Sequence, residues 1–368
     1  MKVAITGADG FLGRHLQVRL RAVSDHEVVA IPRKVLVDPA SLRKAVEGVQ
    51  VVVHLAGVNR DTPEAVETGN VALATRLLEA LDATGEPTTV VYANSIHAGT
   101  DTPYGRGKQR SAELLADWAQ RRGSGFVDIV FQNLFGEGGR PHYNSVVATF
   151  CHLLATGGKP QIDVDRPMEL MHAQDAAALI INRLQPFSGT RTVETSGHES
   201  TVSGVLGVLE EIAGTYVTGR IPSLQEPFHL QLFNTYRSHL YPEWFPRPLV
   251  AHSDERGAFV EVVQSVGGEG QTSFSTTRPG ITRGNHFHLR KVERFVVVKG
   301  QARIAIRPVT GTKVSTFDVS GETPMFVDMP TLATHNITNT GDDELLTLFW
   351  INEIFDPTDP DTFFEAVT

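Results

Sequence analysis

Up to about residue 185, short apolar runs alternate with amphipathic stretches, and this alternation restricts the fold more than any other feature of the chain. The apolar runs predict buried strands at Lys2–Thr6, Glu27–Ile31, Val49–His54, Thr89–Ala93 and Phe126–Gln132. The stretches between them predict helices at Gly13–Ala22, Asn70–Ala83 and Lys108–Arg121. Strands that alternate with helices pair in parallel, because each helix carries the chain back to the start of the next strand. The sequence therefore predicts an α/β fold with a doubly wound parallel sheet.

After about residue 250 the pattern changes to short strands that are separated by turn residues. The turns fall at Gly267-Gly268, Pro279-Gly280, Gly311, Gly321 and Gly341-Asp342. This spacing is typical of an all-β barrel or jelly roll. A chain of 368 residues is too long for one ordinary core. The proline-rich stretch Pro242–Pro248 is the natural boundary, so we predict two domains, at 1–247 and 248–368.

Composition excludes several classes of function. The chain has 42 acidic and 33 basic residues, a net charge of -9, and no basic stripe, so we expect no nucleic-acid partner. The first apolar run breaks at once into glycines, which predicts that there is no signal peptide, and no apolar window is long enough to cross a membrane. The only cysteine, Cys151, has apolar neighbours and is expected to pack in a helix face rather than act as a nucleophile. We therefore expect a cytoplasmic protein.

A glycine-rich turn follows the first predicted strand and opens the first helix. Glycines at 7, 10 and 13 permit a tight turn and a close approach of the backbone to a pyrophosphate, which then lies at the helix N-terminus. A tight turn without a ligand is the alternative, but the position inside a β-α-β unit favours the dinucleotide. The spacing resembles that of extended short-chain dehydrogenase/reductases, whose fold is Rossmann-type. The expected cofactor-binding residues here are Gly7, Asp9, Gly10, Phe11 and Gly13.

The residues after the second strand indicate which nicotinamide cofactor binds. An acid there would bind the ribose 2′-hydroxyl of NAD, whereas an arginine accommodates the 2′-phosphate of NADP. The chain reads Pro32-Arg33-Lys34 and has no acid until Asp38. Arg33 therefore favours NADPH, although two solvated surface bases would look the same. Leu55, Ala56 and Gly57 resemble the family's segment beside the adenine and nicotinamide riboses.

Tyr104 and Lys108 stand four residues apart, on one face of a predicted helix. A lysine ammonium near the phenol lowers its pKa and also holds the nicotinamide ribose, so the tyrosine can exchange a proton with an alcohol or ketone. Ser95, just after the strand Thr89–Ala93, would hydrogen-bond the carbonyl oxygen. Tyr-x-x-x-Lys alone is common, but after a Rossmann glycine turn, and with this serine, we predict a catalytic triad of Ser95, Tyr104 and Lys108.

The segment that begins at Asn133 resembles the family's Asn-Val-Tyr-Gly segment, with Gln132 as a local departure. The stretch from Arg140 through Asn144, together with Arg166, stands where such enzymes bind the sugar nucleotide. Arg140 and Arg166 are our candidates for the diphosphate, because guanidinium groups bind phosphate with two parallel hydrogen bonds. Ordinary solvated arginines are the alternative reading.

The second half carries four metal-ligand residue types at a regular spacing. It reads Gly-x5-His-x-His-x4-Glu-x6-Gly, followed by Pro330-x4-His335-x3-Asn339. This pattern resembles the two cupin motifs, with Leu332 where a glycine is usual. We predict that the metal ligands are His286, His288, Glu293 and His335. Three imidazoles and one carboxylate suit Zn²⁺, although Fe, Ni and Mn accept such sites, and a vestigial site is the alternative.

The order of the two halves and four segments resemble the bifunctional capsular-polysaccharide enzymes of the CapF type. The segments are Arg140–Cys151, Ile281–His288, Thr334–Gly341 and Phe355–Phe363. The resemblance implies that the cupin epimerises carbon 3 of a UDP-2-acetamido-2,6-dideoxy-hexos-4-ulose. The reductase domain would then reduce the carbon 4 ketone with NADPH, which gives UDP-N-acetyl-6-deoxy-L-talosamine. We also expect a homodimer.

The epimerisation base is open. No tyrosine follows Tyr241, so the barrel cannot supply the His/Tyr pair that deoxysugar epimerases of the cupin class use. Lys291 is our candidate, because a partly buried lysine can titrate low enough to accept a proton; a solvated lysine at a strand end is the alternative. Two other functions stay possible: a plain NADP-dependent sugar reductase with a structural cupin, and a regulator that senses dinucleotides. The intact triad argues against the regulator.

Overall fold

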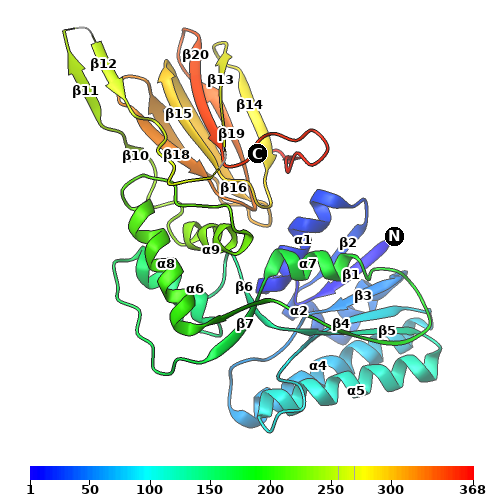
Figure 1. Ribbon diagram of the computed structural model, residues 1–368. Helices are drawn as coiled ribbons and strands as arrows, with labels where there is room; N and C mark the ends of the chain where they lie inside the picture. The colour runs from blue at the N-terminus through cyan, green and yellow to red at the C-terminus, as the bar shows by residue number, and fades with distance from the viewer. Residues whose placement is uncertain (256, 269) are drawn as a thin grey trace. The chain divides into compact units, whose positions relative to one another are not determined.

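The computed structural model of the chain describes residues 1–255, 257–268 and 270–368 (Figure 1). The chain forms two compact units. The first comprises Met1–Phe135, His142–Ser145 and Pro167–Ser200, and the second comprises Gly136–Pro141, Val146–Arg166 and Thr201–Thr368. Residues 201–247, which the sequence analysis assigns to the first domain, thus make their contacts in the second unit. The boundary at residue 247 stays a prediction.

A parallel six-stranded sheet forms the centre of the first unit. Its order is β2 (Glu27–Ile31), β1 (Lys2–Thr6), β3 (Val51–His54), β4 (Thr89–Ser95), β5 (Gly125–Phe131) and β8 (Gly189–Glu194). Every neighbouring pair is parallel. The predicted α/β fold is confirmed, and β8 is a strand that the sequence analysis missed. A smaller sheet joins β6 (Asn133–Phe135), β7 (Pro167–His172) and β9 (His198–Thr201).

Helices cover both faces of the parallel sheet. Side chains of α1 (Phe11–Val23) and α7 (Ala173–Ile181) form one core with the sheet. The core on the other face includes α3 (Pro39–Val46), α4 (Pro63–Thr84) and α5 (Pro103–Arg122), with the short α2 (Arg33–Leu36) beside them. This arrangement is the doubly wound one, and Figure 1 shows the two helix layers.

Both long helices start earlier than predicted, for the same local reason. Thr62 and Thr102 each accept a hydrogen bond from the backbone N–H three residues on, and a proline follows each of them. A threonine cap with proline in the first turn is a strong helix start, even where the first turn has no apolar periodicity. Both helices end at a glycine in the left-handed conformation, Gly85 and Gly123.

The second unit is built around antiparallel strands. One sheet has the order β10 (Arg247–Pro248), β18 (Met325–Met329), β15 (Glu293–Lys299), β20 (Leu345–Ile351) and β13 (Gln271–Thr277). The other has the order β17 (Ser315–Ser320), β16 (Gln301–Pro308), β19 (Ala333–Asn339), β14 (Thr282–Phe287) and β21 (Phe363–Phe364). A separate hairpin pairs β11 (Ala251–Asp254) with β12 (Gly257–Val260). The predicted jelly-roll barrel is confirmed.

Helices α6 (Val146–Ala155), α8 (Val202–Tyr216) and α9 (Pro227–Ser238) belong to the barrel's unit. A buried polar network ties α8 to the barrel. Tyr216, the last residue of α8, donates a hydrogen bond to Asp328 on β18. The same carboxylate binds the guanidinium of Arg294 on β15 through two bonds, of 2.7 and 3.0 Å. Arg294 and Asp328 are almost completely buried.

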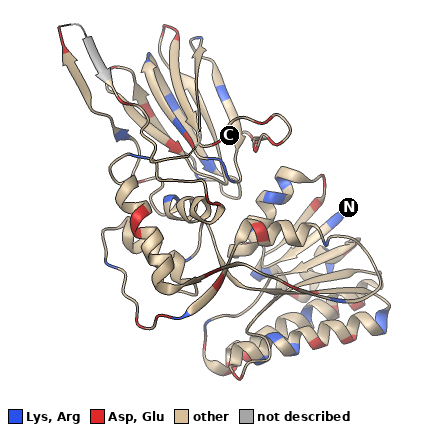
Figure 2. Cartoon of the chain, viewed as in Figure 1, with Lys and Arg blue, Asp and Glu red and all other residues tan. Residues whose placement is uncertain are grey.

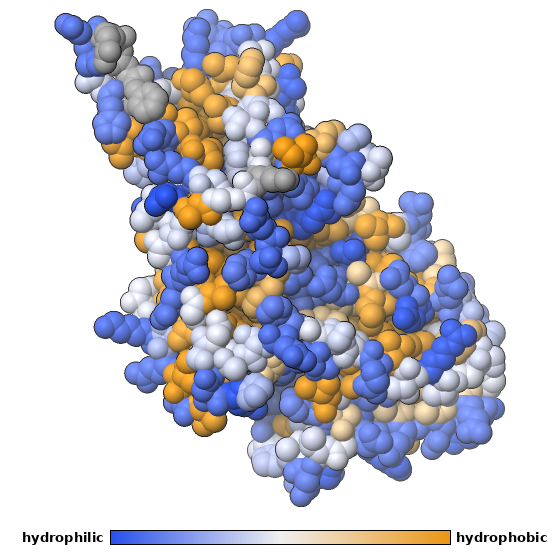
Figure 3. All heavy atoms as spheres, in the orientation of Figure 1, coloured by the Kyte–Doolittle hydropathy of each residue, from blue (hydrophilic) through white to orange (hydrophobic). Residues whose placement is uncertain are grey.

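In the part of the chain that the structure describes, the charged residues form no basic stripe in the view of Figure 2, as the sequence predicts. Basic and acidic residues are interspersed in both units (Figure 2), and hydrophobic residues on the face drawn in Figure 3 lie scattered among hydrophilic ones. Among the residues that the structure describes, no helix combines the length and apolar character that a membrane crossing requires. Cys151 on α6 is buried and free, and burial raises the pKa of its thiol, so the expected packing role is confirmed.

The buried ion pair generates a stability prediction. Asp328→Asn leaves the Arg294 charge buried without its carboxylate, so we expect the free energy of unfolding to fall by about 3–5 kcal/mol. The matched control is Asp318→Asn, which breaks a pair of the same two-bond geometry with Arg303 on the exposed surface and should change stability little. Urea unfolding can be followed by tryptophan fluorescence, because Trp244 stacks on Tyr216. Equal effects of both variants would contradict the prediction.

Candidate active site and metal centre

The glycine turn has the geometry of a dinucleotide-binding loop. Gly7 has a φ of +67°, and a side chain there would place its Cβ 2.8 Å from the backbone nitrogen of Ala56. At Gly13, a Cβ would lie 2.4 Å from the carbonyl oxygen of Gly7. α1 begins directly after Gly10, so the N–H groups of its first turn are presented at the end of β1. Glycine is therefore required at 7 and 13 by close backbone approach, as a pyrophosphate site needs.

The ends of β2 and β3 lie against this turn. The N–H of Gly7 donates to the carbonyl of Ile31, the last residue of β2, at 3.1 Å. Beyond β3, the N–H of Ala56 donates to the Thr6 hydroxyl at 3.3 Å. Arg33 is exposed at the start of α2, two residues after β2 ends. The structure thus brings the predicted cofactor residues of three strand ends to one edge of the sheet.

The three predicted catalytic residues come from adjacent elements. Ser95 is the last residue of β4, while Tyr104 and Lys108 lie in the first two turns of α5. Burial raises the pKa of Tyr104, and the hydrogen bond with the Ser95 side chain partly offsets this. That hydrogen bond places the serine hydroxyl beside the phenol, where both can address one substrate oxygen. The catalytic roles stay predictions, and the geometry suits them.

Lys108 is held differently from our expectation. Its side chain is buried, its ammonium donates to the carbonyl of Ala93 at 2.5 Å and lies 4.2 Å from the centroid of the Tyr92 ring. Burial lowers the pKa of Lys108 to about 7, while the charge of Asp128 raises it. The expected lowering of the pKa of Tyr104 by a lysine charge is therefore wrong for this arrangement, since burial dominates and the pKa of Tyr104 is raised.

A partly buried polar pair next to Lys108 was not predicted. Asn94, next to Ala93 on β4, donates to the carboxylate of Asp128 on β5 at 3.0 Å. Burial raises the pKa of Asp128. One oxygen of each residue is buried without a hydrogen-bond partner in the described part of the chain. Asp128 lies within an apolar strand run, and its neighbours gave no signal of a site.

The predicted substrate residues fall in both units and are described within each. In the first unit, the Asn133 amide donates to the Glu169 carbonyl at 3.1 Å. Asn144 follows a segment that Arg60 holds through the carbonyl of His142, at 3.1 Å, and through its position over the Tyr143 ring. In the second unit, Arg140 and Arg166 have exposed side chains. These four roles stay predictions.

The barrel brings the four predicted metal ligands together. Donor atoms of His286, His288, Glu293 and His335 all lie within 4.8 Å of one another. Glu293 is central: one of its carboxylate oxygens lies 3.1 Å from Nε2 of His288, 3.1 Å from Nε2 of His335 and 3.9 Å from Nε2 of His286. His286 is half-buried and the other three are buried. Three imidazole nitrogens and one carboxylate that converge in this way fit a divalent metal such as Zn²⁺.

The pKa shifts of Glu293 and His335 suit metal binding, whereas the raised pKa of His288 means that this imidazole must lose a proton before it binds a metal. Burial raises the pKa of Glu293, but hydrogen bonds with the three histidines lower it more, so the net pKa is well below its usual value. Burial lowers the pKa of His335 to about 4. For His288, burial lowers the pKa, and the contacts with Glu293 raise it above the usual value. An ionised carboxylate beside a neutral imidazole is the form in which both bind metals.

Two residues near the ligands differ from simple expectation. The Lys291 ammonium is buried, donates to the carbonyl of Pro360 at 2.6 Å and lies 4.0 Å from a carboxylate oxygen of Glu353. A solvated lysine is therefore excluded, and its role as a base stays a prediction. Leu332, which stands where a glycine is usual, has a φ of +61°. The backbone thus keeps the left-handed turn, which costs a leucine roughly 1–2 kcal/mol.

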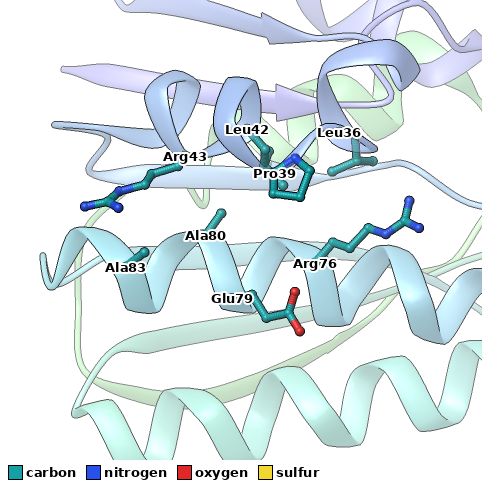
Figure 4. Close-up of a pocket in the computed structure, with 8 residues that line it drawn as sticks. All are labelled: Leu36, Pro39, Leu42, Arg43, Arg76, Glu79, Ala80 and Ala83. Carbon is teal, nitrogen blue, oxygen red and sulfur yellow. The ribbon is translucent and has the colours of Figure 1, made fainter.

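A cavity of about 160 Å³ lies between α2, α3 and α4 (Figure 4). It is smaller than usual sites for drug-sized ligands, and none of the predicted site residues lines it. Its lining residues are Leu36, Pro39, Leu42, Arg43, Arg76, Glu79, Ala80 and Ala83.

Two family descriptions match the chain. Residues 3–195 match the NAD dependent epimerase/dehydratase family, and residues 252–363 match the polysaccharide biosynthesis C-terminal domain. The first match covers the parallel sheet with the Ser95, Tyr104 and Lys108 constellation. The second covers all four metal-ligand residues.

Relatives match over the whole length. A UDP-2-acetamido-2,6-beta-L-arabino-hexul-4-ose reductase of Pseudomonas aeruginosa is 33% identical over 99% of this chain and 98% of that protein. The crystal structure of the capsular polysaccharide assembling protein CapF from Staphylococcus aureus is 32% identical, covers 100% of both chains and has a TM-score of 0.62. A spore coat polysaccharide biosynthesis protein, SpsL of Bacillus subtilis, is 26% identical over 31% of this chain and 82% of its own length.

The matches explain why two unlike sites occur in one polypeptide. A nicotinamide-dependent fold and a polysaccharide-biosynthesis barrel are joined in the same order, and over the same length, as in the full-length relatives. The chain belongs to the NAD dependent epimerase/dehydratase family, as a CapF-type member of the reductase/epimerase class that joins this fold to a polysaccharide biosynthesis C-terminal domain.

Proposed function

We propose that the chain converts a UDP-2-acetamido-2,6-dideoxy-hexos-4-ulose in two steps. The barrel inverts carbon 3, and the Tyr104 site then reduces the carbon 4 ketone with NADPH, giving UDP-N-acetyl-6-deoxy-L-talosamine. The observation that carries the proposal is the four-donor cluster in the barrel of a chain that also holds a reductase triad. The full-length similarity to a protein named UDP-2-acetamido-2,6-beta-L-arabino-hexul-4-ose reductase supports the substrate class.

The reductase step adds a hydride to carbon 4 and a proton to the oxygen of its ketone. NADPH, when bound, supplies the hydride. Tyr104 donates its phenolic proton to the ketone oxygen, and Ser95, which is hydrogen-bonded to that phenol, holds the same oxygen. Lys108 lies one helical turn further along α5, and its ammonium, which donates to the Ala93 carbonyl, would hold the nicotinamide ribose. The carbonyl becomes an alcohol, and the tyrosine is reprotonated from solvent.

The epimerisation step depends on the same ketone. A carbonyl at carbon 4 acidifies the carbon 3 proton, so a base can remove that proton and the opposite face can be reprotonated. A divalent metal held by His286, His288, Glu293 and His335 would supply Lewis-acid stabilisation for developing negative charge. Reduction afterwards removes the ketone, and carbon 3 can then no longer exchange. This order makes the inversion irreversible.

Lys291 remains our candidate for the base, and its surroundings set a condition on that role. Its ammonium donates to the Pro360 carbonyl and lies near Glu353, so it must first lose a proton before the neutral amine can accept one from carbon 3. A reductase with a purely structural barrel is the rival function. Proton exchange at carbon 3 separates the two.

The first prediction tests the reductase site. Tyr104→Phe keeps the ring and removes the transferable proton, so reduction of the 4-keto sugar should fall by roughly 10²-fold or more. NADPH absorbance measures the rate. Tyr241→Phe is the control, because that hydroxyl donates to the backbone carbonyl of Ile306, at 3.4 Å, in the second unit. Near-normal turnover by Tyr104→Phe, with metal content unchanged, would place the active site elsewhere.

The second prediction tests cofactor preference. Arg33→Ala removes a charged partner of the 2′-phosphate, so the KM for NADPH should rise about tenfold to a hundredfold, and the KM for NADH should change little. Arg43→Ala, an exposed arginine on the neighbouring α3, should leave both values unchanged. A wild-type enzyme that prefers NADH would show that the assignment at the end of β2 is wrong.

The third prediction tests the division of labour in the full chain. Tyr104→Phe enzyme, incubated with the 4-keto sugar in deuterated water without NADPH, should incorporate deuterium at carbon 3, because the barrel exchanges this proton by itself. His286→Ala in the same background should abolish the exchange, and Lys291→Ala should do so if the lysine is the base. NMR and mass spectrometry of the recovered sugar measure the label. No incorporation by metal-loaded Tyr104→Phe enzyme would leave the barrel a structural role.

A further inference from the structure

We propose that Asp361, which lies near the C-terminal end of the chain, is a positioning residue for the metal centre. It holds His288 and the loop after His288 in place. The inference rests on the metal site proposed above, and it concerns a residue that is not itself one of the four ligands. Asp361 follows Pro360 in a segment without regular structure, 73 residues after His288.

The Asp361 carboxylate binds three successive backbone N–H groups. One oxygen accepts from Leu289 at 3.0 Å. The other accepts from Arg290 at 3.0 Å and from Lys291 at 2.8 Å. These three residues belong to the loop 289–292, which connects His288 with Glu293, two of the ligands. One side chain thus determines the course of the loop that connects them.

The Asp361 main chain acts directly on His288. Its carbonyl oxygen lies 2.5 Å from Nδ1 of the imidazole. A carbonyl can only accept a hydrogen bond, so Nδ1 carries a proton, and Nε2 is the nitrogen that can lose its proton and offer a lone pair to a metal. Nε2 is the atom that lies 3.1 Å from the Glu293 carboxylate. Asp361 therefore selects the tautomer that turns Nε2 toward the other donors.

Residues around Asp361 hold the same segment against the ligand strands. We call residues 359–365 the C-terminal clasp. Within it, the carbonyl of Pro360 accepts from Lys291, and Asp359 forms an ion pair with Arg290 at 2.9 Å. Its short strand β21 pairs with β14, where Phe364 lies opposite His286. The clasp thus contacts the strand of one ligand, the side chain of a second and the loop that leads to a third.

Packing alone does not account for an aspartate at position 361. It is 1% exposed, and a buried carboxylate is costly unless it is fully hydrogen-bonded. Its φ of +40° is a conformation that few residues other than glycine adopt, and aspartate is among the better tolerated. Its three carboxylate bonds are all to the ligand loop. The hydrogen bonds that offset the cost of burying this carboxylate are thus all made to the loop between two of the ligands.

The experiment measures metal affinity in the full-length protein. Zn²⁺ is titrated in competition with a chromogenic chelator, and Co²⁺ is used as a spectroscopic probe of the ligand set. Loss of a partner that orients a ligand typically weakens metal binding 10–100-fold, so we expect this loss for Asp361→Ala. Both variants keep the main-chain carbonyl, but Asp361→Asn also keeps one acceptor oxygen for the loop, and should weaken binding by less. The cobalt absorption bands should shift or broaden in Asp361→Ala.

Asp356→Ala is the matched control. This acid lies five positions earlier in the same C-terminal segment and is exposed, and its carboxylate bonds the backbone and hydroxyl of Thr358. Its removal should leave the Zn²⁺ affinity and the cobalt spectrum unchanged. Near-ultraviolet circular dichroism confirms that each variant is folded. Should Asp361→Ala fail to fold, the Nδ1–H resonance of His288 in Asp361→Asn, relative to wild type, supplies the second measurement.

The outcomes are distinguishable. If the wild-type chain binds neither metal, the proposed metal centre fails, and the positioning role fails with it. If the wild type binds and folded Asp361→Ala binds with equal affinity and the same cobalt spectrum, the metal centre stands and the positioning role is overturned. In the event that Asp361→Ala cannot be folded, wild-type affinity and an unchanged His288 resonance in Asp361→Asn would overturn it likewise. A graded loss, from wild type through Asp361→Asn to Asp361→Ala, supports the role.

Discussion

Parallel pairing of the central sheet is the constraint on which the reductase site depends. Strands that run in one direction bring their carboxyl ends to one edge, so residues far apart in sequence must meet there. The glycine turn follows β1, Arg33 follows β2, and Ser95 ends β4. The chain leaves β1 toward β2 on one side and returns to β3 on the other, which makes β1 and β3 the switch point of the sheet. Ligands of open α/β sheets bind at such points.

In the barrel, antiparallel strands bring the four donor residues together. Antiparallel β14 and β19 put His286 directly across from His335, and Glu293 begins the strand β15 in the facing sheet. A bulge makes this possible: the register shifts between Gly284 and His286, and the residue between them, Asn285, has a φ of +62°. A regular strand would pair His286 with Thr334, one position off and on the other face. The extra residue returns the imidazole to the interior.

Sequence patterns predicted local features well and long-range contacts poorly. The bounds of β1 and β2 are those predicted, because an apolar run with a glycine turn or a proline after it leaves little choice. The cluster of His286, His288, Glu293 and His335 was predicted because the spacing of these residues is itself the signal. The buried surroundings of Lys108 could not be predicted, since Asp128 is one polar residue in an apolar run. The bonds of Asp361 span about 70 residues, and no local pattern indicates such a partner.

The network of Tyr216, Asp328 and Arg294 bears on how two such enzymes could have been fused or could be recombined. The helices α8 and α9 precede the barrel in the chain, yet their side chains bond to it. Asn234 of α9 donates to the carbonyl of Arg290, and Arg237 donates to that of Met329. A crossover at the proline-rich stretch would join a foreign reductase to this barrel. The buried carboxylate of Asp328 would then lack the hydrogen bond from the Tyr216 hydroxyl. A crossover just before α8 would carry the helices along with the strands they cover. The exchangeable module of this chain is therefore larger than its barrel.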